Sequence, residues 1–134
     1  MSIRIKSSDL DICAATVAAL ASDQRHGIWA CLAWMIRNRL LALPMGVTQN
    51  EHAVSDVCGD IVREALGEDR LLTEASFIST ADRCRLYAVN SLVWAGDLDD
   101  ETGGAIACHR HDKSPSWARS RTPTALLGPF LFFR

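Results

Sequence analysis

The residues whose types and order could support binding or catalysis lie in the last third of the chain. An acidic turn, a glycine pair and a histidine follow one another there. Residues 100–105 are Asp-Glu-Thr-Gly-Gly-Ala, and His109 comes shortly after them. Two adjacent glycines let the backbone turn tightly or approach a ligand closely. A Ser-Pro-Ser-Trp-Ala segment follows at 114–118, and its tryptophan offers a large flat surface, although tryptophan fills a core at least as often. Each of these features alone is about as likely to be an ordinary turn or core residue as part of a site.

The same region contains side chains that can bind metals or act as nucleophiles. Residues 108–112 are Cys-His-Arg-His-Asp, but zinc sites normally draw their ligands from two separated clusters, and no second cluster is present. A Cys108–His109 nucleophilic pair would need a third, orienting group that the sequence does not indicate. The acidic residues of 97–101 lack the spacing of a calcium loop. We therefore expect no metal site and no cofactor, and an exposed acidic turn.

This order of motifs resembles the C-terminal half of the SleB-like cell-wall hydrolases, which cut the glycan strands of peptidoglycan with a lysozyme-like active site. The family's pattern is similar to Asp-Pro-Thr-Gly-Gly-Ala followed by an aromatic residue and His or Asn; Glu101 stands where proline is usual and Cys108 where the aromatic residue is usual. An Asn-Arg-Leu step at 38–40 matches the family's Asn-Arg-Val at the end of an apolar helix. The family's Gln-Phe-Ser-x-Trp motif is not evident between residues 58 and 80.

The resemblance implies a single lysozyme-like domain over residues 1–134 and a cleft for a substrate or partner. The positions that match the family's motifs, or that replace its polar residues, are Asn38, Gly103, Gly104, His109, Trp117, Phe130 and Phe133. Phe130 and Phe133 replace a histidine and a tyrosine that the family commonly carries near its C-terminus. Two hydrogen-bonding groups have thus become purely apolar.

The catalytic acid of the resembled family has no counterpart here. Glycosidic cleavage requires a carboxylic acid held protonated beside the leaving oxygen, and the family places this glutamate near the end of its first helix. Counting back from 38–40 without a gap puts Leu20 and Gln24 at the two acidic positions. A one-residue shift puts Ala19 and Asp23 there. Only Asp23 is a carboxylate, and it occupies the secondary position, so it is the one candidate catalytic residue.

Helical periodicity before residue 96 predicts the elements that position these residues. The expected helices span about 8–20, 26–43, 51–66 and 79–95, with loops at 44–50 and 67–78. Ser8 and Ser79 are the expected N-terminal caps, and Gly67 and Gly96 the stop signals. The second helix is apolar on most of its circumference and is expected at the centre of the bundle.

Further patterns predict the burial of the fourth helix and the structure of the tail. Its expected buried stripe is Cys84, Ala88, Leu92 and Ala95. Glycines and prolines interrupt the sequence after Gly96, so only short strands near 105–109 and 130–133 are expected. The predicted fold class is α+β, mostly α, with about four helices and a small β or irregular C-terminal flap.

Size, charge and cysteine usage narrow the functional classes. A chain of 134 residues corresponds to about one domain. The net charge of −2 gives no global basic field for nucleic acid or an anionic membrane. No run approaches the ~18 apolar residues of a membrane span, and the N-terminus has no apolar signal region. We expect a cytoplasmic protein, with release by another route as an alternative, and reduced thiols at its five scattered cysteines.

Two functional hypotheses follow. The first is a descendant that no longer cuts glycans and binds a peptidoglycan fragment or a protein partner through its altered cleft, without nucleic acid or membrane insertion. The second is an active peptidoglycan glycosidase or lytic transglycosylase whose acid is a relocated carboxylate. The carboxylates considered for that role are Asp23, Glu51, Glu74 and Asp97.

Overall fold

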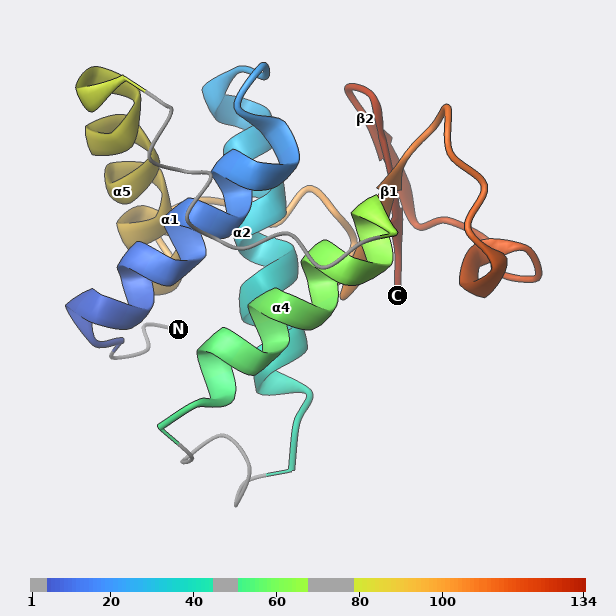
Figure 1. The fold of residues 1–134 in the computed structure, drawn as a ribbon, viewed down its shortest axis with the longest axis horizontal. Coiled ribbons are helices and arrows are strands. Elements are labelled where there is room, and N and C mark those ends of the chain that lie inside the picture. Colours follow the sequence, from blue (N-terminus) through green and yellow to red (C-terminus); the bar gives the residue numbers. More distant parts are fainter. Residues whose placement is uncertain (1–4, 45–50, 68–78) are drawn as a thin grey trace.

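A computed structural model describes residues 5–44, 51–67 and 79–134. The helices in these ranges are α1 (Ser7–Ala21), α2 (His26–Leu41), α4 (Ala53–Leu66) and α5 (Thr80–Ala95). The strands are β1 (Ala107–Arg110), β2 (Ala125–Leu127) and β3 (Phe130–Phe133), with a short 3-10 helix, Ser116–Ala118, between β1 and β2. Figure 1 shows the helices packed together and the small sheet at one end. The predicted class, mostly α with a small β element, is confirmed.

α2 lies at the centre of the helical part, as its apolar circumference predicts. It contacts α1, α4, α5 and β1. Leu32, Ala33 and Met35 are fully buried within it, and complete burial of a large apolar side chain contributes about 1.5 to 3 kcal/mol. The core around α2 therefore holds the helical part and the sheet together.

Most helix ends follow the predicted signals. Gly67 and Gly96 cap α4 and α5 in the left-handed conformation, with φ of 71° and 80°, and the Asp82 amide donates to Ser79 Oγ at 3.1 Å. The expected Ser8 cap is wrong: α1 begins one residue earlier, after Lys6, and no side chain caps it. α2 ends at Leu41, slightly before the predicted position. Most of both predicted loops, at 45–50 and 68–78, lies outside the described residues.

The predicted buried face of α5 is wrong. Cys84, Ala88 and Leu92 are exposed. The buried residues of this helix are instead Leu86, Asn90, Val93 and Trp94. Apolar residues of α5 occur on all sides of the helix, so the sequence pattern does not predict which side is buried. Packing against α1 and α2 determines the buried side.

The sheet has the order β1-β3-β2, with both pairs antiparallel. Cys108 pairs with Phe132 and His109 with Leu131. Because side chains alternate along a strand, Cys108 and Phe132 face the helical core, to which both belong, while His109 lies on the outer face. The predicted strands overlap β1 and β3, and β2 was not predicted.

No helix in the described ranges is long and apolar enough to cross a membrane.

Candidate functional site

The end of α1, where the resemblance requires an acid, is joined to the sheet by Arg110. The Arg110 guanidinium donates to the Leu20 carbonyl at 3.1 Å and to Asp23 Oδ1 at 2.8 Å. Its carbon lies 5.0 Å from the centre of the Phe130 ring. A cation thus occupies the space between the helix end and the sheet.

No side chain at this helix end can act as the required acid. Leu20 is in the core with 2% exposure, and Ala19 is apolar. Partial burial raises the pKa of Asp23, but the hydrogen bond and charge of Arg110, with a contribution from Gln24, lower it below its ordinary value. A general acid in a glycosidase needs the opposite shift. Asp23 is therefore an ionised partner of Arg110.

A trough runs beside this helix end, around His26 and Gly27. Two cavities of about 520 and 430 Å³ share these residues. The first is lined by the α1–α2 turn (22–27), Trp29 and Asp82, and the second by Ala30, Cys31, Val89, Leu98, Asp99 and Glu101. We call this combined surface the His26 trough. Its lining combines the carboxylates Asp23, Asp82, Asp99 and Glu101 with apolar side chains such as Trp29, Val89 and Leu98.

The predicted site residues Asn38 and Gly104 meet at Asp100. Asp100 Oδ2 accepts from Asn38 Nδ2 at 2.9 Å and from the Gly104 amide at 3.2 Å. Its Oδ1 accepts from the Thr102 amide at 2.8 Å and hydroxyl at 2.6 Å. Burial by itself would raise the pKa of Asp100. The four hydrogen bonds have the larger, opposite effect, so its pKa lies below the ordinary value. This half-buried carboxylate is ionised and fully used in holding the turn.

The glycine pair completes this turn rather than opening a cavity. Gly103 and Gly104 have φ of 70° and 80°, a region that L-residues other than glycine seldom adopt. A Cβ on Gly103 would lie 3.4 Å from the Thr124 Cβ, and the Thr124 hydroxyl donates to the Thr102 carbonyl at 2.8 Å. The turn is thereby packed against the start of β2.

The predicted residues His109, Trp117 and Phe133 form an aromatic cluster on the outer face of the sheet. The His109 ring is stacked on Phe133 with centroids 5.3 Å apart, and Trp117 meets His109 edge-on at 5.7 Å. His109 is only 4% exposed. Phe130 lies on the opposite face, in the core. The structure thus divides the predicted cleft residues among the Asp100 turn, the aromatic cluster and the core.

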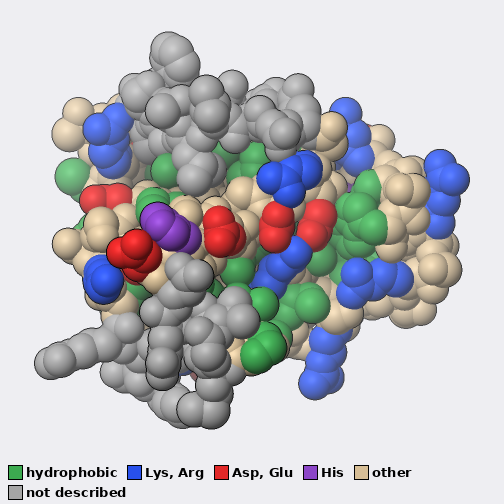
Figure 2. All heavy atoms as spheres, turned by 60° about the horizontal axis from the view of Figure 1, so that its bottom comes forward, with side chains coloured by type: hydrophobic (Ala, Val, Ile, Leu, Met, Phe, Trp, Pro, Cys, Tyr) green, Lys and Arg blue, Asp and Glu red, His purple; other side chains and the backbone are tan. Residues whose placement is uncertain are grey.

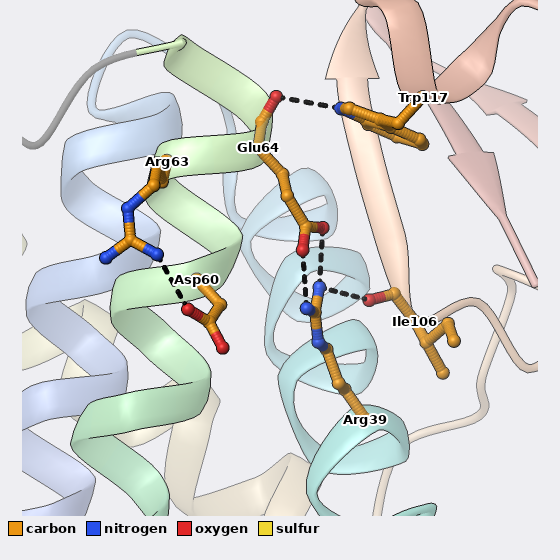
Figure 3. Close-up of polar contacts among 6 residues, drawn as sticks. All are labelled: Arg39, Asp60, Arg63, Glu64, Ile106 and Trp117. Carbon is orange, nitrogen blue, oxygen red and sulfur yellow. Dashed lines mark hydrogen bonds and ion pairs between the residues drawn. The ribbon is translucent and has the colours of Figure 1, made fainter.

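Sequence reasoning missed an ion pair that links α2, α4 and the sheet (Figure 3). Arg39 donates to both carboxylate oxygens of Glu64, at 2.6 and 2.5 Å, and the Trp117 Nε1 donates to the Glu64 carbonyl at 3.1 Å. The hydrogen bond with Glu64 raises the pKa of Arg39. This pair lines a cavity of about 240 Å³ together with Trp117 and Arg121. The Glu64 carboxylate is half-buried, but Arg39 occupies both oxygens, so neither is left to protonate a leaving sugar oxygen.

The remaining candidate carboxylates do not form an acidic centre. Glu51 is exposed and pairs with His52 at 3.4 Å, and Asp97 is exposed. Glu74 lies outside the described residues. Cys108 and His109 lie on opposite faces of β1, and the described ranges contain no group of three side chains arranged to hold a metal ion.

Comparison with known proteins adds no further assignment. No family model, curated protein or solved structure matches the chain.

Proposed function

We propose that this protein is a lysozyme-like domain related to the SleB-like hydrolases that binds a peptidoglycan fragment without cutting it. The proposal depends chiefly on the contact between Arg110 and Asp23. Where the resemblance requires a protonated glutamic acid, the chain has Leu20 or Ala19. The carboxylate in the secondary position, Asp23, is ionised and bound to an arginine. A carboxylate in that state cannot supply the proton that the leaving sugar oxygen needs.

The His26 trough is the surface that we assign to binding. It borders the α1–α2 turn, where the active site of the resembled family would lie. Asp23 and Asp82 are bound by Arg110 and Arg85, whereas Asp99, Glu101 and His26 can accept or donate hydrogen bonds to a ligand. Hydroxyl, amide and ammonium groups of a wall fragment complement these side chains, and the apolar lining can contact the faces of its sugar rings.

Sedimentation with insoluble peptidoglycan tests binding and cleavage in one experiment. We expect the protein to sediment with the polymer and to release no muropeptides between pH 4 and pH 9. Asp99→Asn/Glu101→Gln should weaken sedimentation, because it removes two exposed carboxylates of the trough. Asp56→Asn/Asp60→Asn is the matched control, because it neutralises two exposed carboxylates of α4 that do not line the trough.

Release of muropeptides would contradict the loss of activity. The alternative hypothesis, an active glycosidase with a relocated carboxylate, is then favoured by one observation: Asp99 and Glu101 line the trough and make no hydrogen bond within the described residues. Release that disappears in Asp99→Asn/Glu101→Gln would assign them, and release that disappears in Asp23→Ala would assign Asp23. Failure to sediment would remove the binding proposal.

A further inference from the structure

A further cavity lies on the outer face of the sheet, away from the His26 trough. Its volume is about 380 Å³, within the range of about 300 to 1,000 Å³ that small-molecule sites occupy. His109, Leu131 and Phe133 contribute its floor from β1 and β3, and the segment 111–123 forms its rim. We call it the outer-sheet cavity.

The charged side chains that line this cavity, among the residues that the structure describes, are cationic. They are Lys113, Arg119 and Arg121, and no described aspartate or glutamate lines it. Asp112 is adjacent in sequence but exposed, and it does not line the cavity. In Figure 2, acidic side chains lie over the helical part with Lys and Arg side chains among them, and the right-hand end, which carries the sheet, shows Lys and Arg side chains.

Arg121 is held in place at the edge of the cavity. Its guanidinium carbon lies 5.6 Å from the Trp117 ring centre and 5.8 Å from that of Phe133, and it donates to the Arg134 backbone oxygen. A guanidinium has five N–H donors, so this contact leaves several for a ligand. Holding a cation in position before binding reduces the entropy lost when the ligand binds.

Both histidines are oriented by backbone carbonyls. Nδ1 of His109 lies 2.6 Å from the Arg110 oxygen, and Nδ1 of His111 lies 3.1 Å from the Pro129 oxygen. A carbonyl only accepts, so Nδ1 donates in each ring. His111 is exposed, and its Nε2 is left for a ligand, whereas the buried His109 forms part of the cavity floor.

We propose that the outer-sheet cavity binds a multiply charged oxyanion, a phosphate monoester or diphosphate group. Three cationic side chains match the charge of such a group. A single carboxylate would compensate only one of them, and a metal cation would be repelled. The apolar floor formed by Leu131 and Phe133 accommodates a carbon portion attached to the phosphate. The proposal goes beyond the proposed function and concerns a different cavity.

Calorimetric titration with pyrophosphate, inorganic phosphate and acetate tests the charge requirement. We expect one pyrophosphate per chain, weaker binding of phosphate, and no measurable binding of acetate. Lys113→Ala/Arg119→Ala should weaken pyrophosphate binding at least tenfold. Neither side chain has a partner within the described ranges, so this variant should fold normally, which circular dichroism can check.

Arg83→Ala/Arg85→Ala is the matched control. It removes the same charge from α5, which lies at the opposite end of the molecule from the sheet (Figure 1), and should bind pyrophosphate as the unmodified chain does. Equal weakening in this control, absence of pyrophosphate binding, or acetate binding as tight as that of pyrophosphate would each overturn the proposal.

Two further measurements distinguish the source of the phosphate. Vesicles of phosphatidylcholine containing phosphatidic acid present the monoester as a lipid headgroup, and glucose 6-phosphate presents it on a free molecule. If the protein sediments with these vesicles and pyrophosphate reverses this, a lipid source is supported. If it binds glucose 6-phosphate but does not sediment with the vesicles, a soluble source is supported. Vesicle binding that Lys113→Ala/Arg119→Ala leaves unchanged would count against the cavity.

Discussion

Neighbouring carboxylates in this protein differ sharply in what surrounds them. Asp100 accepts four hydrogen bonds in the turn after α5, and Asp23 is bound by Arg110. Asp99 is exposed and makes no hydrogen bond within the described residues. Sequence shows three aspartates of equal chemistry, and their roles differ only through their partners.

Asp100→Ala should destabilise the protein by about 2 to 4 kcal/mol, because it leaves half-buried donors without a charged acceptor. Asp99→Ala is the adjacent control and should change the free energy of unfolding by less than about 0.5 kcal/mol. Urea unfolding followed by tryptophan fluorescence measures both. Equal effects of the two substitutions would show that the Asp100 contacts do not hold the turn.

At the scale of the elements, glycines in turns determine how closely a hairpin or a helix end can pack against its neighbours. Gly128 lies in the β2–β3 hairpin with φ of 56°, and a Cβ there would lie 2.8 Å from Ile28 Cδ1 on α2. The hairpin approaches α2 so closely that a Cβ here would require the end of the Ile28 side chain to move. Gly67 has a similar φ of 71°, but nothing lies within 4 Å of its Cβ position.

Alanine substitutions at Gly67 and Gly128 distinguish the cost of backbone strain from the cost of a steric contact. Gly67→Ala should cost about 1 to 2 kcal/mol, the price of the left-handed conformation for a residue with a Cβ. Gly128→Ala should cost more, because its Cβ also displaces Ile28. In Gly128→Ala/Ile28→Val the Cδ1 is absent, so the loss measured by urea unfolding should be smaller than the sum of the two single losses. Strict additivity would argue against the close contact.

At the scale of the whole molecule, burial determines which thiols can react. Cys13, Cys31, Cys58 and Cys108 are buried, and Cys84 is exposed. Burial raises the pKa of Cys31 to about 11 and that of Cys108 to about 12. The pKa of Cys13 is raised by its hydrogen bond with Cys58 and by burial.

The folded protein should therefore show one rapidly reacting thiol, because the thiolate is the nucleophile and must be accessible. A chromogenic aromatic disulfide at pH 8 should report one fast equivalent, with four more after denaturation. Cys84→Ser should abolish the fast phase. More than one fast equivalent in the folded protein would contradict the packing of α1, α2, α4 and β1 around the buried cysteines.

Acid should lower the free energy of unfolding of the whole domain through Asp23 and Asp100. The folded pKa values of Asp23 and Asp100 are lowered, so their stabilisation is fully present above the unfolded value of about 3.9. It is lost as the pH falls through their folded pKa values. The urea midpoint should fall from pH 5 towards pH 2. Asp100→Asn should flatten this decline more than Asp23→Asn, because the Asp23 side chain is 61% exposed and more screened by water. A midpoint that rises on acidification would refute this linkage.

The sequence by itself determined the helices, several of their ends and the fold class, because periodicity and glycine caps act over a few neighbouring residues. The resemblance stated from the sequence predicts Leu20 or Ala19 at the position of the family's glutamate. The tertiary structure alone decided which face of α5 is buried, and it alone joined Arg110 to Asp23 across 87 residues. Arg39–Glu64 and the outer-sheet cavity likewise depend on distant segments that only packing brings together.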